Sequence, residues 1–464
     1  MMTILGTPTH PFRVAVIGSG PSGFYATDAL LNNALGLTVD VDMFERLVTP
    51  YGLVRGGVAP DHAKIKTVTK VYDKIAQHER FRYFGNVTFG KDILHADLAQ
   101  HYHQVLYAVG ASVSRGLGIA GETLSGCYGA AEFVAWYNGH PDYRDLQFDL
   151  SHHTVAVVGN GNVAMDVTRI LTSTIAELSK TDIADYALEA LRHSNVQRVV
   201  MLGRRGSAEA AFTHPELKEF GELEQAQVMV SLEEATPSEV SLKYLTDKSK
   251  QKNVEMLKDY ASRPRDPNKH KEIVMRFLVS PVEAHGTDRL AQLTLVQNEL
   301  IETADGQVRP RATDRTETLE LGALFSSIGY KGVALPDVPF DERGGVFPNQ
   351  SGRLLTAPNG QVVTGEYVAG WIKRGPSGII GTNKPDSVET VKLMLADAQA
   401  GQHFQPVHTA SEAIPTLLNT REVRFVSFAE WQRVDAEEVH RGQADGRPRV
   451  KFTDTASMLA LLEQ

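Results

Sequence analysis

The chain has 464 residues, of which 42 % are hydrophobic and 22 % charged, and its formal net charge is −9 at pH 7. This composition is typical of a globular protein of two or three domains, and the negative charge argues against general nucleic-acid binding, which requires a basic surface. No apolar run reaches the roughly 18 residues that span a bilayer, and residues 1–11 lack a signal or transit pattern. We therefore expect a cytoplasmic protein without membrane insertion.

The first predicted unit places a glycine-rich turn between a strand and a helix. Residues 13–18 predict the strand and residues 22–33 the helix, and the turn between them reads Gly18-Ser19-Gly20-Pro21-Ser22-Gly23. In such a turn Gly18 permits the bend, and Gly20 lets the backbone approach a pyrophosphate. Gly23 allows the helix to pack closely on the strand. This pattern indicates a dinucleotide-binding fold.

Glu45 supplies the acidic residue that such a fold requires. It ends the next predicted strand, residues 37–45, and follows Gly23 by 22 residues. A carboxylate at this point binds the ribose hydroxyls of a dinucleotide. The alternative is an ordinary glycine-rich loop followed by a surface glutamate.

A buried strand at residues 104–110 is followed by the single cysteine, Cys127. A disulfide, a Cys-x-x-Cys centre, a Cys₄ zinc site and an iron–sulfur cluster all require more thiolates. We expect Cys127 to be a small buried apolar residue, and we predict no metal site.

A second turn of the same design lies further along the chain. Residues 154–159 predict a strand, a helix begins near Asn162, and the turn reads Gly159-Asn160-Gly161-Asn162-Val163-Ala164. Residues 172–194 are longer than a minimal crossover needs, so they extend this helix or add another. Unlike the first unit, the next strand, residues 198–203, does not end in an acid.

That strand runs into Gly203-Arg204-Arg205-Gly206. A carboxylate here would repel a 2′-phosphate, whereas two guanidinium groups can clamp one. Arg204 and Arg205 therefore predict NADP(H) rather than NAD(H), with two solvated surface arginines as the alternative. The two turns together predict FAD on the first and NADP(H) on the second.

The remaining chain continues the alternation of strands and helices. Residues 242–276 contain ten Lys or Arg and five Asp or Glu, a local charge of +5. Strand-like segments come next at 293–296 and 323–329, and residues 332–360 form a Pro/Gly-rich connection. This pattern favours doubly wound α/β domains.

Several of these stretches together resemble one family, the adrenodoxin-reductase type of ferredoxin–NADP reductase. The resemblance covers nearly the whole chain and rests on these motifs: Gly-Ser-Gly-Pro-Ser-Gly (18–23), Tyr-Gly-Leu-Val-Arg-Gly-Gly-Val-Ala-Pro-Asp-His (51–62), Gly-Asn-Gly-Asn-Val-Ala (159–164), Gly-Arg-Arg-Gly (203–206) and Gly-Trp-Ile-Lys-Arg-Gly-Pro-Ser-Gly-Ile-Ile-Gly-Thr-Asn (370–383). It implies two Rossmann-like domains, with the NADP domain inserted in the FAD domain. The implied boundaries are 1–112 and 331–464 for FAD and 113–330 for NADP, with the strands at 104–110 and 323–329 bracketing the insertion.

The resemblance also implies cofactor-binding residues. For FAD they are the first turn with Ser22, and Glu45, Leu53, Val87, Arg115, Trp371, Gly378, Ile379 and Ile380. For NADP(H) they are Asn160, Gly161, Asn162, Val163, Arg204, Arg205 and Glu216. The Gly-Asp that usually ends the late strand of flavoenzymes is Gly370-Trp371 here, so we expect backbone groups rather than a carboxylate at that edge of the flavin.

His62 and Glu216 each have two interpretations. His62 could cap a helix that begins near Ala63, and Glu216 has the position of a first-turn helix acid. By resemblance both lie where nicotinamide meets flavin, so that His62 influences reduction and Glu216 orients NADPH.

The resemblance implies hydride transfer from NADPH to FAD and then single-electron transfer to a ferredoxin. Ferredoxins are usually acidic, so residues 242–276 are a candidate docking surface, with a solvated helix and loop as the equal alternative. A disulfide reductase and the cluster-bearing flavin subunit of an amidotransferase-type synthase are excluded because they need more cysteines. An NADPH-dependent flavin monooxygenase and a non-enzymatic redox sensor stay open as alternatives.

Overall fold

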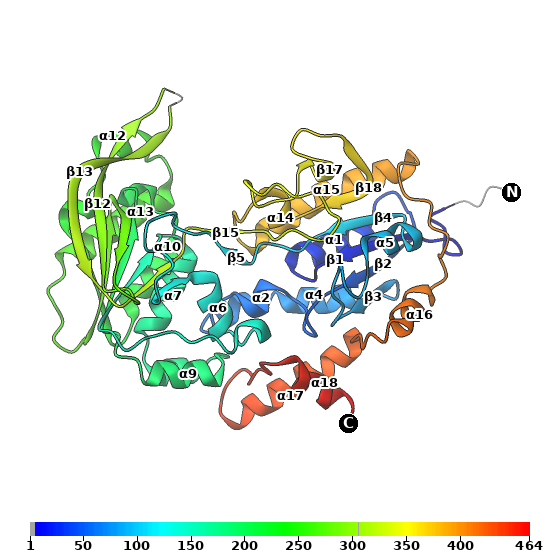
Figure 1. The fold of residues 1–464 in the computed structure, drawn as a ribbon, viewed down its shortest axis with the longest axis horizontal. Helices are drawn as coiled ribbons and strands as arrows, with labels where there is room; N and C mark the ends of the chain where they lie inside the picture. The colour runs from blue at the N-terminus through cyan, green and yellow to red at the C-terminus, as the bar shows by residue number, and fades with distance from the viewer. Residues whose placement is uncertain (1–4, 305) are drawn as a thin grey trace.

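The computed structural model describes residues 5–304 and 306–464. In Figure 1 the two halves of the molecule stand side by side, with β1 and β2 in the right half and β12, β13 and α10 in the left half. The C-terminal helices α17 and α18 lie below the junction of the two halves. The chain passes from the first half to the second and back, as the predicted insertion requires.

Strands from the N-terminal part of the chain and from the part that follows the second sheet together form the first sheet. Its strand order is β16-β17-β18-β4-β1-β2-β3, parallel from β18 to β3 and antiparallel from β16 to β18. The strands are β1 (Phe12–Ile17), β2 (Val39–Phe44), β3 (Phe81–Phe84), β4 (Gln104–Tyr107), β16 (Asn349–Gln350), β17 (Arg353–Leu355) and β18 (Val362–Val368).

Alternation along β1 buries both faces of this sheet. Val14 and Val16 pack in the core with helices α1 (Pro21–Leu31) and α15 (Asn383–Gln399), whereas Ala15 and Ile17 pack in the core with α5 (His95–His101) and α16 (Ala413–Thr420). A strand buried on both faces reads as a continuous apolar run, which is why β1 was predictable from sequence.

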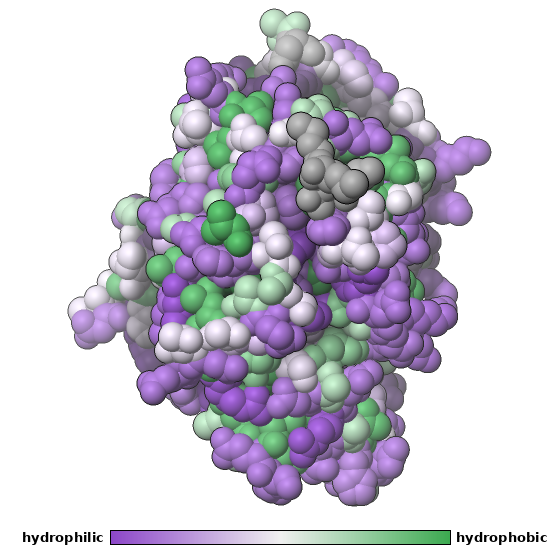
Figure 2. Space-filling model, turned by 90° about the vertical axis from the view of Figure 1, so that its right-hand side faces the viewer, coloured by the Kyte–Doolittle hydropathy of each residue, from purple (hydrophilic) through white to green (hydrophobic). Residues whose placement is uncertain are grey.

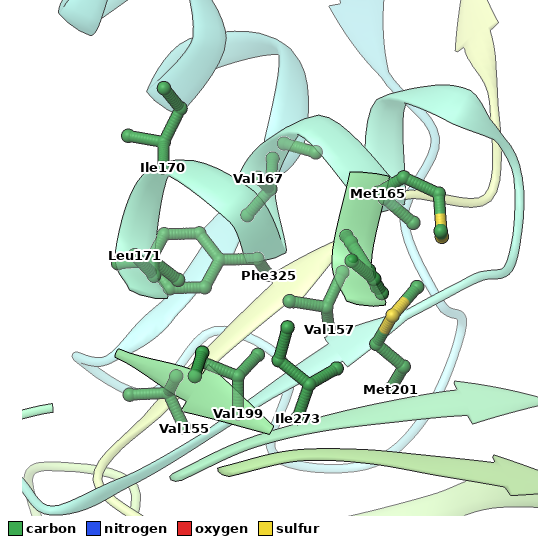
Figure 3. Packing of buried hydrophobic residues seen from close by; sticks show 14 of the residues in the cluster. Val155, Val157, Met165, Val167, Ile170, Leu171, Val199, Met201, Ile273 and Phe325 are labelled. Atoms are coloured by element: carbon green, nitrogen blue, oxygen red, sulfur yellow. The ribbon is translucent and has the colours of Figure 1, made fainter. Parts of the chain in front are cut away.

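The second sheet is parallel throughout, with the order β6-β14-β7-β8-β10-β9. Its strands are β6 (Cys127–Gly129), β7 (Thr154–Val158), β8 (Arg198–Gly203), β9 (Ala226–Met229), β10 (Lys271–Phe277) and β14 (Ala323–Ser326). Figure 3 shows Val155, Val157 and Val199 beneath α7 (Asn162–Thr172), whose Val167 and Leu171 face them.

The opposite face of the second sheet is covered by an antiparallel sheet. Ala156, Val158 and Leu202 pack against β11 (Val279–His285) and β12 (Gln292–Glu302), and β13 (Val308–Glu320) completes the order β11-β12-β13. Only residues 293–296 of this layer were predicted from the sequence. The long β13 is mostly exposed, so it lacks the apolar run that identifies a buried strand.

Several boundaries differ from expectation. Residues 172–194 follow the second of the two predicted alternatives, because they add helices, α8 (Ile175–Leu178) and α9 (Asp185–Arg192), and do not extend α7. The strand predicted at 323–329 is β14, which lies between β6 and β7 inside the second sheet instead of bracketing it. The short pair β5 (Val113–Ser114) and β15 (Tyr330–Lys331) lies close to both predicted domain boundaries, which themselves stay predictions.

The other elements are short connections and the C-terminal helices. They are α2 (Leu53–Gly56), α3 (Ala63–Lys66), α4 (Thr69–Ala76), α6 (Ala130–Tyr137), η1 (Pro141–Tyr143), η2 (Ser207–Glu209), α10 (His214–Glu222), α11 (Leu232–Ala235), α12 (Glu239–Tyr244), α13 (Lys248–Ser262), α14 (Trp371–Arg374), η3 (Ile380–Thr382), α17 (Phe428–Ala444) and α18 (Thr455–Leu462). No helix of the described residues combines the length and apolar character needed to cross a membrane. On the face drawn in Figure 2, hydrophobic residues are scattered among hydrophilic ones.

Cys127 differs from its predicted environment. It is half-buried rather than buried, because it begins β6 at the edge of the second sheet. Its burial, with the nearby Glu122 carboxylate, raises the pKa of the Cys127 thiol to about 11, so the thiol is protonated at neutral pH and is a poor nucleophile.

Helix α17 supports the segment 51–62. The Trp431 indole donates to the Tyr51 hydroxyl (3.4 Å), and Arg55 donates to both oxygens of Glu438 (2.5 and 2.8 Å). The Glu438 side chain is fully buried and also accepts from the backbone of Phe452. A buried carboxylate of this kind leaves uncompensated cations when it is removed.

We therefore expect Glu438→Ala to lower the free energy of unfolding by about 3–5 kcal/mol, as breaking a buried ion pair does. Urea unfolding of the FAD-loaded protein measures this. The adjacent Glu437→Ala is the control, because the Glu437–Arg441 pair is partly solvent-exposed and such pairs contribute at most about 1 kcal/mol. Equal losses for the two variants would contradict the buried-pair interpretation.

Candidate active site

The first glycine turn has the geometry that a pyrophosphate requires. A Cβ on Gly18 (φ +102°) would lie 2.7 Å from the Ala108 carbonyl oxygen, and one on Gly23 would lie 2.3 Å from the Gly18 carbonyl oxygen. At Gly20 a Cβ would have no neighbour within 4 Å. Two glycines are thus required by packing, and Gly20 leaves open space before Pro21, the first residue of α1. The turn fits a phosphate group held at a helix N-terminus.

Glu45 lies against this turn rather than on a free surface. Its Oε2 accepts hydrogen bonds from the Ser19 amide (3.1 Å) and the Ser19 hydroxyl (2.6 Å), and its Oε1 accepts from the Leu47 amide (3.1 Å). These bonds fix the carboxylate beside the phosphate turn. Val87 is buried next to it and donates its amide to the Glu45 carbonyl.

The second turn repeats the first. A Cβ on Gly159 (φ +134°) would lie 2.2 Å from the Ser327 carbonyl oxygen, whereas one on Gly161 would have no neighbour within 4 Å. The Asn160 carbonyl accepts from the amides of Ala211 and Phe212, and Asn162 Oδ1 accepts from the Thr213 amide (2.9 Å). The loop 211–213 therefore holds the turn in place, with Val163 in the first turn of α7.

Arg204 and Arg205 follow β8 and are both exposed. Their carbonyl oxygens accept from the Asn298 amide group and the Leu278 amide, so the backbone is anchored. Within residues 5–304 and 306–464 neither guanidinium has a hydrogen-bond or ion-pair partner. Two free guanidinium groups on a fixed backbone fit the binding of a phosphate.

The late motif 370–383 lies directly on the first turn. Gly370 has φ +79°, and a Cβ there would lie 2.0 Å from Ser22 Oγ, which donates to Asn383 Oδ1 (3.1 Å). Gly378 also has a positive φ, Ile379 is 64 % exposed, and Ile380 begins η3. Ile379 directly follows Gly378, and an isoleucine so exposed fits a surface that a bound group covers.

A carboxylate at this turn was not predicted from the sequence. The Gly370 amide donates to Asp386 Oδ2 (2.6 Å), although Asp386 lies 16 positions along the chain in α15. Lys373 and Arg374 both pair with Asp386. The absence of the usual Gly-Asp pair is therefore matched by an acid from the next helix, which no local motif indicates.

Residues from both halves of the molecule meet at a small apolar cluster. Leu53, Val163 and Trp371 all pack against the cluster of Tyr330, Ala111 and Ala131, and the ring centroids of Tyr330 and Trp371 are 5.9 Å apart. Arg115 supports it from behind by donating to the carbonyls of Tyr330 and Gly344. Residues predicted for FAD and for NADP(H) therefore lie side by side.

A polar cluster adjoins this junction. His62 Nε2 lies 3.0 Å from Glu219 Oε2, and His62 Nδ1 lies 3.7 Å from Asp166 and 3.9 Å from Glu216. Arg169 donates to Glu216 (3.0 Å) and to other carboxylates of the cluster. His62 is the residue before α3, but its side chain makes no capping hydrogen bond, so it faces the cluster instead.

Burial and charge shift the proton affinities here. Burial, together with the Asp166 carboxylate, raises the pKa of Glu216 to about 7. Burial opposes the charged form of His62, but the hydrogen bond to Glu219 and the nearby Asp166 and Asp61 carboxylates together outweigh it and raise the pKa of His62. The same hydrogen bond lowers the pKa of Glu219. Glu216 can therefore change protonation near neutral pH, and the surroundings of His62 favour its protonated form.

The ligand atoms of His62, Glu216 and Glu219 lie within 4.8 Å of one another. A divalent cation prefers such donors, but the guanidinium of Arg169 already supplies positive charge to two of these carboxylates. We assign no metal ion to the cluster. Asp166 and Arg169 were not predicted, although their spacing on α7 places two charged residues on one face of an otherwise apolar helix.

The chain is similar to known reductases over nearly its whole length. Residues 12–250 match the family described as pyridine nucleotide-disulphide oxidoreductase. The chain is 43 % identical to the NADPH-ferredoxin reductase FprA of Mycobacterium leprae, with 98 % of this chain and 99 % of that protein covered. It is 39 % identical to the mitochondrial NADPH:adrenodoxin oxidoreductase of Salvelinus fontinalis, with 98 % and 91 % covered. The structure of Mycobacterium tuberculosis FprA in complex with NADPH matches with a TM-score of 0.92, 41 % identity, and 98 % and 100 % coverage.

The raised pKa of Glu216 predicts a pH-dependent stability. A carboxyl whose pKa is raised from 4.5 to about 7 by folding stabilises the protein below pH 4.5, and this contribution is lost as pH rises through 7. Glu216→Gln lacks the titrating carboxyl and therefore this loss of stability. The urea midpoint of the variant, measured relative to that of the wild type, should increase between pH 5 and pH 7.5. Glu222→Gln, on the exposed side of α10, is the control. Parallel wild-type and Glu216→Gln curves would show that Glu216 keeps an ordinary pKa.

Proposed function

The chain belongs to the NADPH–ferredoxin reductases of the adrenodoxin-reductase type, and we propose on this basis how its residues carry electrons from NADPH to a ferredoxin-type iron–sulfur protein. It is an oxidoreductase that uses FAD and NADP(H). The observation that carries the assignment is the junction of Leu53, Val163 and Trp371 around Tyr330. The FAD that these residues would hold would supply hydride acceptance from NADPH and single-electron release to the partner.

We propose that the first turn, Glu45 and the late motif bind FAD. Their support is the open space at Gly20, the fixed Glu45 carboxylate and the contact of Gly370 with Ser22. The complete set is Gly18, Gly20, Pro21, Ser22, Gly23, Glu45, Leu53, Val87, Arg115, Trp371, Gly378, Ile379 and Ile380. Arg115 would act through the backbone of Tyr330 and Gly344, to which it donates.

We propose that the second turn, Asn160 to Val163, holds the pyrophosphate of NADP(H), and that Arg204 and Arg205 hold its 2′-phosphate. Glu216 orients the nicotinamide, and His62 adjusts the charge beside the reacting rings. Support comes from their shared position next to the Leu53–Val163–Trp371 junction, from the pKa of Glu216 of about 7, and from the raised pKa of His62. The protein's contribution is positioning and electrostatics rather than a nucleophile.

Coenzyme choice tests the arginine pair. Replacing both Arg204 and Arg205 by Gln removes two charge-assisted contacts of about 1.5–3 kcal/mol each, so KM for NADPH should rise by about 100-fold or more. KM for NADH, which lacks the 2′-phosphate, should change little. Arg198→Gln, at the other end of β8 and also exposed, is the control. An equal loss for NADPH and NADH would contradict the 2′-phosphate assignment.

The structure narrows the predicted docking surface. Within residues 242–276, Arg263, Arg265 and Arg276 pair with neighbouring acids, so they are largely neutralised. Lys248, Lys250, Lys252 and Lys258 on α13 are exposed and have no ion pair within the described part of the chain. We propose that these exposed lysines of α13 attract an acidic ferredoxin.

Charge reversal of Lys248, Lys250 and Lys252 to Glu tests this surface. Because the lysines would steer an acidic partner, KM for ferredoxin in cytochrome c reduction should rise about tenfold, and the effect of salt should weaken. Ferricyanide reduction, which needs no docking, should stay unchanged. The exposed lysines Lys70, Lys74 and Lys91, reversed together, give the same change in net charge at another surface. Equal responses of the two triple variants would remove α13 as the docking face.

We also propose a cytoplasmic location. The single cysteine, with its protonated thiol, suits a reducing compartment. Cell fractionation of the native protein tests this.

A further inference from the structure

Arg169 lies at the centre of the polar cluster and on the helix that follows the second glycine turn. Its side chain is 4 % exposed. Nε and Nη2 bind the two oxygens of Asp61 (2.5 and 3.1 Å), Nη2 also binds Asp166 (2.6 Å), and Nη1 binds Glu216 (3.0 Å). The guanidinium therefore makes a bidentate pair and two further charge-assisted bonds, the strongest kind of polar contact.

These partners come from both halves of the molecule. Asp61 belongs to the segment 51–62, which packs on the first glycine turn through the bond from the Tyr51 amide to the Ser19 carbonyl (3.0 Å). Asp166 lies on α7, and Glu216 lies on α10. One side chain thus connects the segment that carries His62 with the helix that carries Glu216.

Arg169 also determines where His62 lies. The His62 side chain makes no bond to its own helix α3, and the next residue toward the N-terminus, Asp61, is held at both oxygens. Clamping Asp61 fixes the backbone from which His62 projects toward Glu219. Arg169 itself is buried, and four of its five N–H donors are bound to carboxylates of the cluster.

Removing Arg169 leaves other links between the two halves in place. Lys66, four residues after His62, pairs with Asp182 (2.7 Å), and Lys451 pairs with the same carboxylate (3.3 Å). Without Arg169, the two halves would therefore still be attached to each other. The position of His62 relative to Glu216 depends more strongly on Arg169.

We propose that Arg169 is a positioning residue for hydride transfer: it holds Asp61 and Glu216 so that His62 and Glu216 face the same space beside the Leu53–Val163–Trp371 junction. This inference rests on the proposed transfer from NADPH to FAD. It predicts two separable effects, one from the charge of the guanidinium and one from its bidentate geometry.

The charge effect arises from the groups that face the cluster. They are Asp61 and His62 from segment 51–62, Lys66 from α3, Asp166 from α7, Glu216 and Glu219 from α10, Tyr137 from α6, and Tyr330. The positive charge of Arg169 lowers the proton affinity of both Glu216 and His62. Loss of this charge should raise the pKa of Glu216 and the pKa of His62. Any limb of the pH–rate profile for flavin reduction that either group produces should then move to higher pH.

The experiment measures flavin reduction by NADPH under anaerobic stopped-flow conditions from pH 5.5 to 9. We expect Arg169→Met to keep FAD and to bind NADP⁺ within about threefold of the wild type. Its limiting rate of flavin reduction should fall about 10- to 100-fold, because misplaced reacting groups react more slowly. The limb of its pH–rate profile should move to higher pH. Arg169→Lys retains the charge but not the fork, so its limb should stay near the wild-type position while its rate remains lowered.

Two further variants guard against loss of folding. Asp61→Asn weakens the bidentate pair without removing the cation, so it should lower the rate. Because the Asp61 carboxylate raises the pKa of His62, any pH dependence that His62 produces should move to lower pH, opposite to the shift in Arg169→Met. Arg192→Met changes an exposed arginine of the same half, which pairs with the exposed Glu189, and should behave as the wild type.

Each outcome decides a separate point. If NADPH does not reduce the wild-type flavin, the proposed function is wrong. If it does, and Arg169→Met and Asp61→Asn both retain FAD together with the wild-type rate and pH limb, Arg169 has no positioning role. A loss of FAD from both variants would also overturn the inference, because it would make Arg169 a structural support of the FAD site.

Discussion

The structure depends on the contact between segment 51–62 and the helices α7 and α10. A hydride travels only when donor and acceptor rings are in contact, so two nucleotide sites on separate sheets must share one junction. The chain builds it from an apolar part, Leu53, Val163 and Trp371 around Tyr330, and a charged part around Arg169. Helix α17 stabilises the same segment through Trp431 and Glu438. These contacts explain why the C-terminal helices pack on the first half.

The two halves use the same turn but differ in the side chains beside it. A carboxylate held by Ser19 stands beside the first turn, and two exposed guanidinium groups lie at the end of the strand after the second. This difference is the basis of our proposal that FAD binds at the first turn and NADP(H) at the second, because a carboxylate accepts hydroxyl donors and repels a phosphate.

Sequence reasoning succeeded where the evidence is local. Strand β1 is an uninterrupted apolar run, and Gly18, Gly20 and Gly23 are spaced for one turn, so both were predictable. It failed where contacts join distant segments. Asp386 reaches the Gly370 amide from the next helix, Arg169 pairs with Asp61 across 108 positions, and β13 is too exposed to show a strand pattern. Cys127 was placed too deep because its position at a sheet edge is a tertiary property.

The most direct test of convergent nucleotide sites is anaerobic mixing of the purified protein with NADPH or NADH while the visible flavin absorbance is followed, with oxidised ferredoxin added afterwards. We predict that the protein carries FAD, that NADPH bleaches its absorbance much faster than NADH, and that ferredoxin restores it in step with its own reduction. A flavin that NADPH leaves oxidised, or a reduced flavin that ferredoxin does not reoxidise, would contradict the claim that the two sites converge for electron transfer.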